Sequence, residues 1–283
     1  MAPLDSLPER LVPMDMAAIR SHWHDWATQY GADLRATTKT NTIKQLELDA
    51  FTRALRAAGR TTGTVLEIGC GNGVNCLSLA QQFPALAFTG VDYVPEMITA
   101  AHQTLARQPE LAKRVKFQVG NVLEMGTASD LAGHYDVVFT DRMVINLNTW
   151  ELQARALDQL AAKVAPGGLL LMIENFTGCY GRQNELRVKA GLPPRQPASY
   201  NLFLEERQFE AHLGRTLKLV AAEDFAALHD LVLYVLGAVA NKGEVDYANP
   251  LVQAATDLTL ALQGSKPLGD FGQNRLYVFR RER

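Results

Sequence analysis

The strongest constraint on the fold is a run of alternating glycines directly after a short apolar segment. Residues 65–73 read Val-Leu-Glu-Ile-Gly-Cys-Gly-Asn-Gly, and residues 73–82 have the pattern of a helix. Glycines at alternate positions let the chain turn tightly and approach a ligand at van der Waals distance. The following helix directs its N-terminal amides toward whatever is bound. The run therefore predicts a nucleotide site at the carboxyl edge of a parallel sheet.

The spacing of the glycines indicates which nucleotide this loop binds. A dinucleotide fingerprint needs Gly-x-Gly-x-x-Gly, and Val74 stands where the third glycine would be. The alternative pattern, an acidic residue followed by Gly at every second position, is complete in Glu67, Gly69, Gly71 and Gly73. A carboxylate at the strand end would repel a pyrophosphate and attract a cationic ammonium or sulfonium. The loop therefore favours a cationic ligand over a dinucleotide-binding or purely structural α/β domain.

The rest of the central chain alternates short apolar segments with helical ones. Strands are predicted at residues 65–68, 87–91, 115–119, 137–140 and 169–173, and helices at residues 73–82, 95–107 and 150–164. The strand segments are apolar without alternation, as strands buried on both faces must be. Such an order predicts a Rossmann-like, doubly wound and mostly parallel sheet.

Two further regions flank this sheet. Residues 1–62 are predicted as an N-terminal arm with two cap helices, at residues 16–34 and 41–58, and residues 63–283 as the α/β domain. Near the C-terminus, strands at residues 216–220 and 276–279 enclose helices at 225–240 and 251–262. A connection of that length is not a hairpin, so we interpret residues 224–272 as a helical insertion before the last strand.

Three more elements follow the glycine loop in a fixed order. Gly-Val-Asp-Tyr ends the second strand at residues 90–93, Gly-Asn-Val follows the third at 120–122, and Val-Ala-Pro-Gly-Gly precedes the fifth at 164–168. With the loop, these elements resemble the class I S-adenosylmethionine-dependent methyltransferases over residues 65–176. The resemblance implies a methyltransferase that uses S-adenosylmethionine as its cofactor.

The resemblance also implies roles for individual residues. Asp92 would accept both ribose hydroxyls, Met97 would pack on the adenine, and Asn121 would lie at the adenine contact. The implied cofactor-binding residues are Tyr30, Glu67, Gly69, Cys70, Gly71, Gly73, Asn75, Asp92, Tyr93, Met97, Asn121, Val122 and Asp141.

The acceptor is predicted to be a small polar metabolite, methylated on N or O. Family members that methylate nucleic-acid amines carry Asn/Asp-Pro-Pro-aromatic after strand four, and this chain has Thr-Asp-Arg-Met at residues 140–143. The net charge is −2 and the 28 Lys and Arg are scattered, whereas a nucleic-acid binder clusters its cations. An RNA methyltransferase and a non-methylating S-adenosylmethionine-binding protein remain as alternatives.

The candidate catalytic and acceptor-binding residues come from the cap, from strand ends and from the insertion helix, and also from residues 180–201, a region with a loop at 191–195 where members of the family vary to fit their substrates. Residues 22–31 resemble the cap helix of small-molecule methyltransferases, and the ends of strands four and five open onto the crevice where ligands bind. The candidate catalytic residues are His22, Tyr30, Asp141 and Glu174. The candidate substrate-binding residues are Trp26, Arg142, Asn146, Asn175, Tyr180, Tyr200 and His229.

No metal is expected at this site. Asp141 with Glu174 and Asn175 resembles the magnesium site of catechol-type methyltransferases, but the surrounding sequence does not, so metal-free polar contacts are favoured. The three cysteines are an odd number without a Cys-x-x-Cys pair, which predicts neither a disulfide framework nor a zinc site.

Location and assembly are predicted from the ends and the insertion. The Pro-containing and acidic N-terminal residues do not resemble a signal peptide, and the apolar stretch at 225–240 is too short for a membrane span, which needs about 20 residues. These features predict a cytoplasmic protein with no membrane or nucleic-acid partner. The apolar insertion helix is a candidate homodimer interface.

Overall fold

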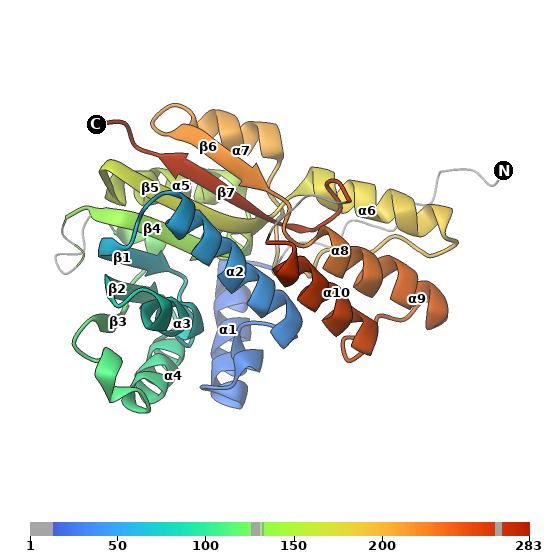
Figure 1. The fold of residues 1–283 in the computed structure, drawn as a ribbon, viewed down its shortest axis with the longest axis horizontal. Helices are drawn as coiled ribbons and strands as arrows, with labels where there is room; N and C mark the ends of the chain where they lie inside the picture. Colours follow the sequence, from blue (N-terminus) through green and yellow to red (C-terminus); the bar gives the residue numbers. More distant parts are fainter. Residues whose placement is uncertain (1–13, 126–130, 132, 264–267) are drawn as a thin grey trace.

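The computed structural model describes residues 14–125, 131, 133–263 and 268–283. It contains a seven-stranded sheet with helices on both faces (Figure 1). The strands are β1 (Thr62–Ile68), β2 (Ala85–Asp92), β3 (Val115–Val119), β4 (Tyr135–Asp141), β5 (Val164–Asn175), β6 (Lys218–Glu223) and β7 (Asn274–Arg280). Their order is β3-β2-β1-β4-β5-β7-β6. The five strands from β3 to β5 in this order are all parallel, whereas β7 is antiparallel to both of its neighbours, β5 and β6. The predicted Rossmann-like, mostly parallel sheet is therefore confirmed.

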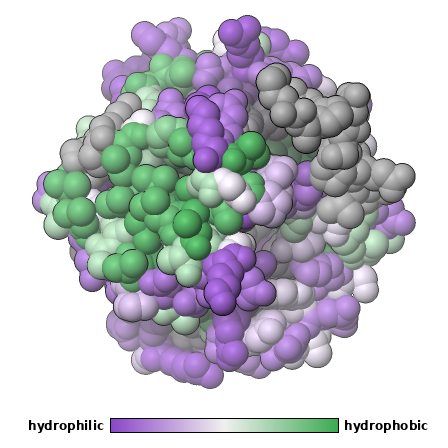
Figure 2. Space-filling view, turned by 90° about the vertical axis from the view of Figure 1, so that its right-hand side faces the viewer, coloured by the Kyte–Doolittle hydropathy of each residue, from purple (hydrophilic) through white to green (hydrophobic). Residues whose placement is uncertain are grey.

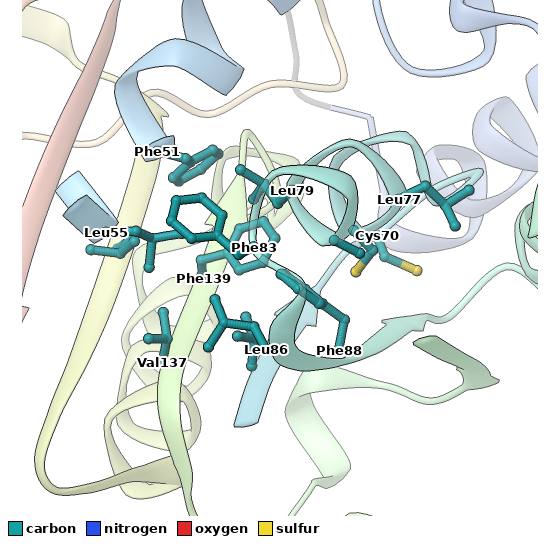
Figure 3. Packing of buried hydrophobic residues seen from close by; sticks show 14 of the residues in the cluster. Phe51, Leu55, Cys70, Leu77, Leu79, Phe83, Leu86, Phe88, Val137 and Phe139 are labelled. Carbon is teal, nitrogen blue, oxygen red and sulfur yellow. The ribbon is translucent and has the colours of Figure 1, made fainter. Parts of the chain in front are cut away.

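Consecutive residues of the central strands face opposite sides of the sheet, so each strand contributes to two cores. Val65 belongs to the core under α2 (Asn41–Ala57), α3 (Val74–Gln82) and α4 (Pro95–Ala106). Leu66 belongs to the core under α5 (Trp150–Lys163) and α7 (Glu206–Leu213). In the first core, the rings of Phe51 and Phe139 pack edge to face with 4.9 Å between the ring centres (Figure 3). Burial on both faces explains why these strands are apolar without alternation.

The first cap helix, α1 (Met16–Tyr30), packs on α4. Asp15 caps its N-terminus by accepting a hydrogen bond from the amide of Ala18, and Gly31 with φ of 48° ends it. The predicted helix over 16–34 therefore ends at Tyr30, and a short 3₁₀ turn, η1 (Leu34–Ala36), follows. The second cap helix is α2, which begins next to the Thr40 cap. Most of the predicted N-terminal arm, residues 1–13, lies outside the described residues.

Two helices between β5 and β6 were not predicted. They are α6 (Thr177–Lys189), which is rich in polar residues and has little of the apolar periodicity that marks a helix, and α7, which is only eight residues long. The Pro-Gly-Gly at 166–168, predicted to precede the fifth strand, is part of β5. The predicted strand at 216–220 is shifted to Lys218–Glu223.

The helical segment before β7 contains an unusual turn. The predicted helix at 225–240 is present as α8 (Ala227–Asp230), a π-helical segment η6 (Leu231–Leu236) and α9 (Gly237–Ala240), with α10 (Pro250–Ala261) following. Its residues 264–267 lie outside the described part of the chain. Wide π turns of this kind are frequent at functional sites. Within the described residues, no helix is long and apolar enough to span a membrane.

Candidate active site

A cavity of about 750 Å³ lies at the carboxyl ends of the parallel strands, within the usual range for ligand sites. Its walls come from the glycine turn, from α1 and the start of α2, from the segment around residues 195–203, and from α8 with η6. The cavity thus places the cap and the segment before β7 over the edge of the sheet where the glycine turn opens.

The glycine turn uses conformations that side chains disfavour. Gly69 and Gly71 have φ of 76° and 51°, and a Cβ on Gly71 would lie 2.5 Å from Cγ2 of Thr37. Both residues line the cavity. Gly73, also predicted to contact the cofactor, does not line it; a Cβ there would lie 2.6 Å from the ring of Phe117, so this glycine serves helix packing instead.

Asp92 is held at the end of β2 by backbone amides. Its two carboxylate oxygens accept hydrogen bonds from the amides of Gly71 at 2.8 Å and Val94 at 3.0 Å. Burial raises the pKa of Asp92 to about 6. Next to it, Oδ1 of Asn72 and Oη of Tyr93 are buried and have no hydrogen-bond partner in the described part of the chain, and both residues line the cavity. Such orphaned polar atoms beside a carboxylate fit a ligand that brings its own donors and acceptors.

Most of the predicted cofactor-binding residues line the cavity, and Tyr30 is an exception. Those that line the cavity are Gly69, Cys70, Gly71, Asn75, Asp92, Tyr93, Met97, Asn121, Val122 and Asp141. Tyr30 does not line it and instead packs against Trp26 at 5.1 Å and under the guanidinium of Arg35. Its predicted cofactor and catalytic roles therefore do not fit its place.

Glu67 requires a correction in both place and charge. Its side chain is fully buried, does not line the cavity, and accepts hydrogen bonds from Nδ2 of Asn75 and Sγ of Cys76, each at 2.9 Å. Burial raises the pKa of Glu67 to about 8, so the carboxyl group is mostly neutral at pH 7. The argument that Glu67 attracts a cationic ligand is thus wrong for this structure; Glu67 orients Asn75, which does line the cavity.

A balanced group of four charges lies at the floor of the cavity. Nζ of Lys44 contacts Glu47 at 2.7 Å and Asp141 at 2.5 Å, while Nε of Arg142 contacts the same two carboxylates at 2.9 and 3.4 Å. Burial opposes the ionisation of Asp141, but the two cations outweigh it and lower the pKa of that carboxyl below its usual value. Arg142 has φ of 54°, a strained backbone conformation typical of functional sites.

Lys44 and Glu47 were missed in the sequence. Both lie on the buried side of α2 together with Leu46 and Ala50. Two opposite charges three residues apart on an apolar face were the available signal, because charges are buried only when they are paired.

Glu174 also requires a correction. It is fully buried, does not line the cavity, and accepts hydrogen bonds from Oγ1 of Thr140 and from the amides of residues 143, 144 and 145. Glu174 therefore fixes the turn after β4 rather than reaching an acceptor. Among the described residues no group of three His, Cys, Asp or Glu side chains could hold a metal ion, and Asp141 is already neutralised by cations.

An aromatic wall comes from α1 and residue 200. The rings of His22 and Tyr200 stack at 4.2 Å, and Nε1 of Trp23 donates a hydrogen bond to Asn146 at 3.2 Å. Nε2 of His22 is buried without a partner, and burial lowers the pKa of this imidazole although Asp25 acts in the opposite direction.

On the side of α8, His229 forms a pair with a carboxylate. Its Nδ1 lies 2.8 Å from Oδ1 of Asp230, and its Nε2 lies 3.0 Å from Oγ1 of Thr42. The other oxygen of Asp230 accepts from the amide of Gln273 at 2.8 Å. All the predicted substrate-binding residues line the cavity, namely Trp26, Arg142, Asn146, Asn175, Tyr180, Tyr200 and His229.

Comparisons with known proteins agree with this geometry. Residues 60–190 match the model of a family described as a methyltransferase domain. The chain is 29% identical over 120 residues to the ribosomal RNA small subunit methyltransferase C of Haemophilus ducreyi, and 30% identical over 102 residues to norajmaline N-methyltransferase of Rauvolfia serpentina. These alignments cover 41% and 36% of this chain, and 34% and 33% of the relatives. The chain thus spans about a third of the length of these two curated relatives.

Two solved structures share the fold. Magnesium protoporphyrin IX methyltransferase from Synechocystis, with bound SAH, has a TM-score of 0.60 at 16% identity, covering 95% of this chain and 100% of that one. The N-methyltransferase NodS from Bradyrhizobium japonicum, in complex with S-adenosyl-l-homocysteine, has a TM-score of 0.55 at 14% identity, covering 92% and 99%.

Proposed function

The chain contains a class I S-adenosylmethionine-dependent methyltransferase domain, and on this premise we propose that it methylates an N or O atom of a small polar metabolite. The observation that carries the proposal is that the glycine turn, the aromatic face of α1 and the His229–Asp230 pair meet in one cavity. When bound, S-adenosylmethionine supplies an electrophilic methyl group on a sulfonium. The protein must then position the acceptor, which can contribute about 7–11 kcal/mol to lowering the barrier.

The cofactor residues have distinct roles in this proposal. Asp92 accepts hydrogen bonds from the ribose hydroxyls, because the backbone amides of Gly71 and Val94 hold its carboxylate at the edge of the cavity. Gly69 and Gly71 allow the close approach, and Met97 and Val122 give apolar contacts to the adenine. What supports these assignments is that each residue lines the cavity within the matched segment.

We place the general base at His229. Asp230 orients its ring and stabilises the imidazolium that forms when Nε2 takes the acceptor proton, and Thr42 holds Nε2 in place beforehand. Asp141 is a poor base, because Lys44 and Arg142 neutralise it. His22, predicted as catalytic, contributes an unpartnered Nε2 that suits a hydrogen bond to the acceptor. The aromatic wall and α8 would exclude water during transfer.

An RNA acceptor is the alternative that the ribosomal RNA methyltransferase relative keeps open. Against it, the Lys and Arg residues are scattered along the chain, and the two cations at the floor of the cavity, Lys44 and Arg142, are paired with carboxylates. RNA binding that weakens steeply with salt would support this alternative.

Thermal unfolding with and without S-adenosylhomocysteine tests the proposal, with NAD as the comparison ligand. At 100 times its dissociation constant a ligand stabilises by about 2.7 kcal/mol, a shift of roughly 5–10 °C for a chain of this size. Asp92→Ala should abolish the shift. The matched control is Asp136→Ala, since Asp136 lies at the opposite end of the sheet and, among the described residues, its carboxylate accepts hydrogen bonds from Thr64 alone. A shift with NAD alone would overturn the proposal.

Turnover separates the proposal from a protein that binds the cofactor without methylating. Methyl transfer from labelled S-adenosylmethionine to small amines, alcohols and acids is expected, and it should be lost in His229→Gln. Binding of S-adenosylhomocysteine with no transfer to any acceptor would favour the non-methylating alternative.

A homodimer through the segment before β7 is part of the same proposal. Figure 2 shows apolar side chains gathered on one face of the molecule. The exposed apolar residues of η6, α9 and α10 are Leu236, Val239, Leu251 and Leu258, and an exposed apolar patch of this kind is typical of an interface. Light scattering on the wild type and on Leu251→Lys would test this interface. A cytoplasmic location is also proposed, supported by three free and buried thiols, Cys70, Cys76 and Cys179.

A further inference from the structure

Arg195 is a cavity cation without an anionic partner. It follows α6, lines the cavity, and uses Nη1 to donate hydrogen bonds to the neutral side chains of Gln183 at 2.8 Å and Gln273 at 3.3 Å. Within the described residues, its Nε and Nη2 atoms have no acceptor and no carboxylate forms an ion pair with it. The Nε–Nη2 edge, which can bind an oxyanion side-on with two hydrogen bonds, is therefore available.

Aromatic rings hold this guanidinium in one orientation. Its Cζ lies 3.4 Å from the ring centre of Tyr234 and 5.5 Å from that of Tyr180. Lys44 and Arg142, by contrast, share two carboxylates at the floor of the same cavity. An arginine that is stacked and braced by amides, but not neutralised, fits recognition of an anion better than structural support.

Tyr180 supplies a second, independent indication. Tyr180 is 6% exposed and lines the cavity, yet its hydroxyl has no hydrogen-bond partner among the residues that the structure describes. Burial raises the pKa of Tyr180, so the hydroxyl keeps its proton and remains a donor at neutral pH. A buried donor of this kind without an acceptor is costly unless a ligand supplies one.

The glutamines that brace Arg195 also connect it to the proposed base. The backbone N–H of Gln273 donates a hydrogen bond to Oδ2 of Asp230 at 2.8 Å, and Nε2 of Gln183 donates to the same oxygen at 3.5 Å. Asp230 in turn holds Nδ1 of His229 at 2.8 Å. Figure 1 shows α6 on the same side of the sheet as the helical segment from α8 to α9, and α6 packs on η6, the middle part of that segment. The free edge of Arg195 and the base thus belong to one hydrogen-bonded assembly.

We propose that the methyl acceptor carries an anionic oxygen-acid group, a carboxylate or a phosphate monoester, that binds the Nε–Nη2 edge of Arg195 and the hydroxyl of Tyr180. The acid group anchors the acceptor so that its reacting atom lies toward His229. This inference rests on the proposed function and gives the chemical class of its acceptor.

Probe binding to the protein saturated with S-adenosylhomocysteine tests the inference. The probes are benzoate and phenyl phosphate, which distinguish the two acids, and benzamide as the neutral counterpart. One or both acids should bind with a dissociation constant of about 1 mM or better, and about 10- to 100-fold more tightly than benzamide, as expected for charge-assisted hydrogen bonds. Arg195→Gln should remove this preference, Arg195→Lys should restore part of it, and Tyr180→Phe should weaken acid binding alone.

The matched control is Arg207→Gln, which removes the same charge from an exposed position on α7 and should keep the preference for acids. Equal binding of benzamide and both acids, a preference that survives Arg195→Gln, or binding of neither acid would each overturn the inference while S-adenosylhomocysteine still binds. If that cofactor product does not bind, the proposed function fails. The acid preference of the cofactor-free protein, and its loss or survival in Arg195→Gln, then supports or overturns the anion site by itself.

Discussion

Cofactor affinity should depend on pH through Asp92. Burial raises the pKa of this carboxyl to about 6, while ribose hydroxyls need the ionised form as their acceptor. Below pH 6 most molecules carry a proton on Asp92, and this proton must be released before the ribose can bind. With a pKa of about 6, the ionised fraction falls from about 0.9 at pH 7 to about 0.1 at pH 5, so the dissociation constant of S-adenosylhomocysteine should rise roughly tenfold, or about 1.4 kcal/mol.

Calorimetric titration between pH 5 and 7 would measure this change, and Asp92→Asn should remove it. The variant should bind about 10- to 100-fold more weakly at pH 7, because a neutral amide replaces a charged acceptor. Its amide can accept from only one of the Gly71 and Val94 amides, so a loss of about 1–3 kcal/mol in folding stability is also expected. Asp136→Asn should keep the wild-type pH profile. A flat wild-type profile, or a slope that persists in Asp92→Asn, would refute the reasoning.

Three further substitutions test other parts of the site. His229→Gln should lower kcat by about 10²- to 10⁴-fold for any acceptor that the wild type methylates, with S-adenosylhomocysteine affinity near the wild-type value; an unchanged kcat would place the base elsewhere. Gly71→Ala should lower folding stability by about 1–3 kcal/mol and weaken cofactor binding, because alanine would adopt a φ of 51° against Thr37; unchanged melting and affinity would contradict the tight turn. Glu67→Gln should flatten the pH dependence of stability. The folded pKa of about 8 lies above the ordinary carboxyl value of the unfolded chain, so the stability from the protonated form falls as pH rises from that value to about 8 and levels off above it, with a slope of at most about 1.4 kcal/mol per pH unit. Melting temperatures of both proteins across this range would measure the difference, and parallel curves would show that the pKa of Glu67 is not raised by folding.

The parts of the fold set by local sequence could be predicted. The glycine turn and the apolar strands depend on backbone conformation and burial, which each short segment encodes by itself. Asp92 and Asn121, whose cofactor contacts the family resemblance implied, line the cavity because they lie at or just beyond the ends of such strands. The polar α6 could not be recognised in the same way, since it has little apolar periodicity.

Electrostatic roles were predicted less well, because they depend on contacts between distant segments. Glu67 was expected to act as an anion, but full burial makes its neutral form favourable. Lys44 and Asp141 are 97 positions apart, so neither sequence neighbourhood indicates their ion pair. Arg195 stood in a loop expected to vary with the substrate, and only the structure shows that its neighbours are amides and rings rather than carboxylates.

The π-helical segment Leu231–Leu236 lets a small change in sequence alter the part of the cavity that is proposed to hold the methyl acceptor. A π turn differs from an α turn by one additional residue, so deleting a single residue from it would rotate the following side chains by about 100° around the helix. Leu233 and Tyr234, which line the cavity, would then be replaced by neighbours, while the sheet and the glycine turn would keep their sequence. A one-residue change in length can thus alter the acceptor range in a single evolutionary step without any cost to the cofactor site.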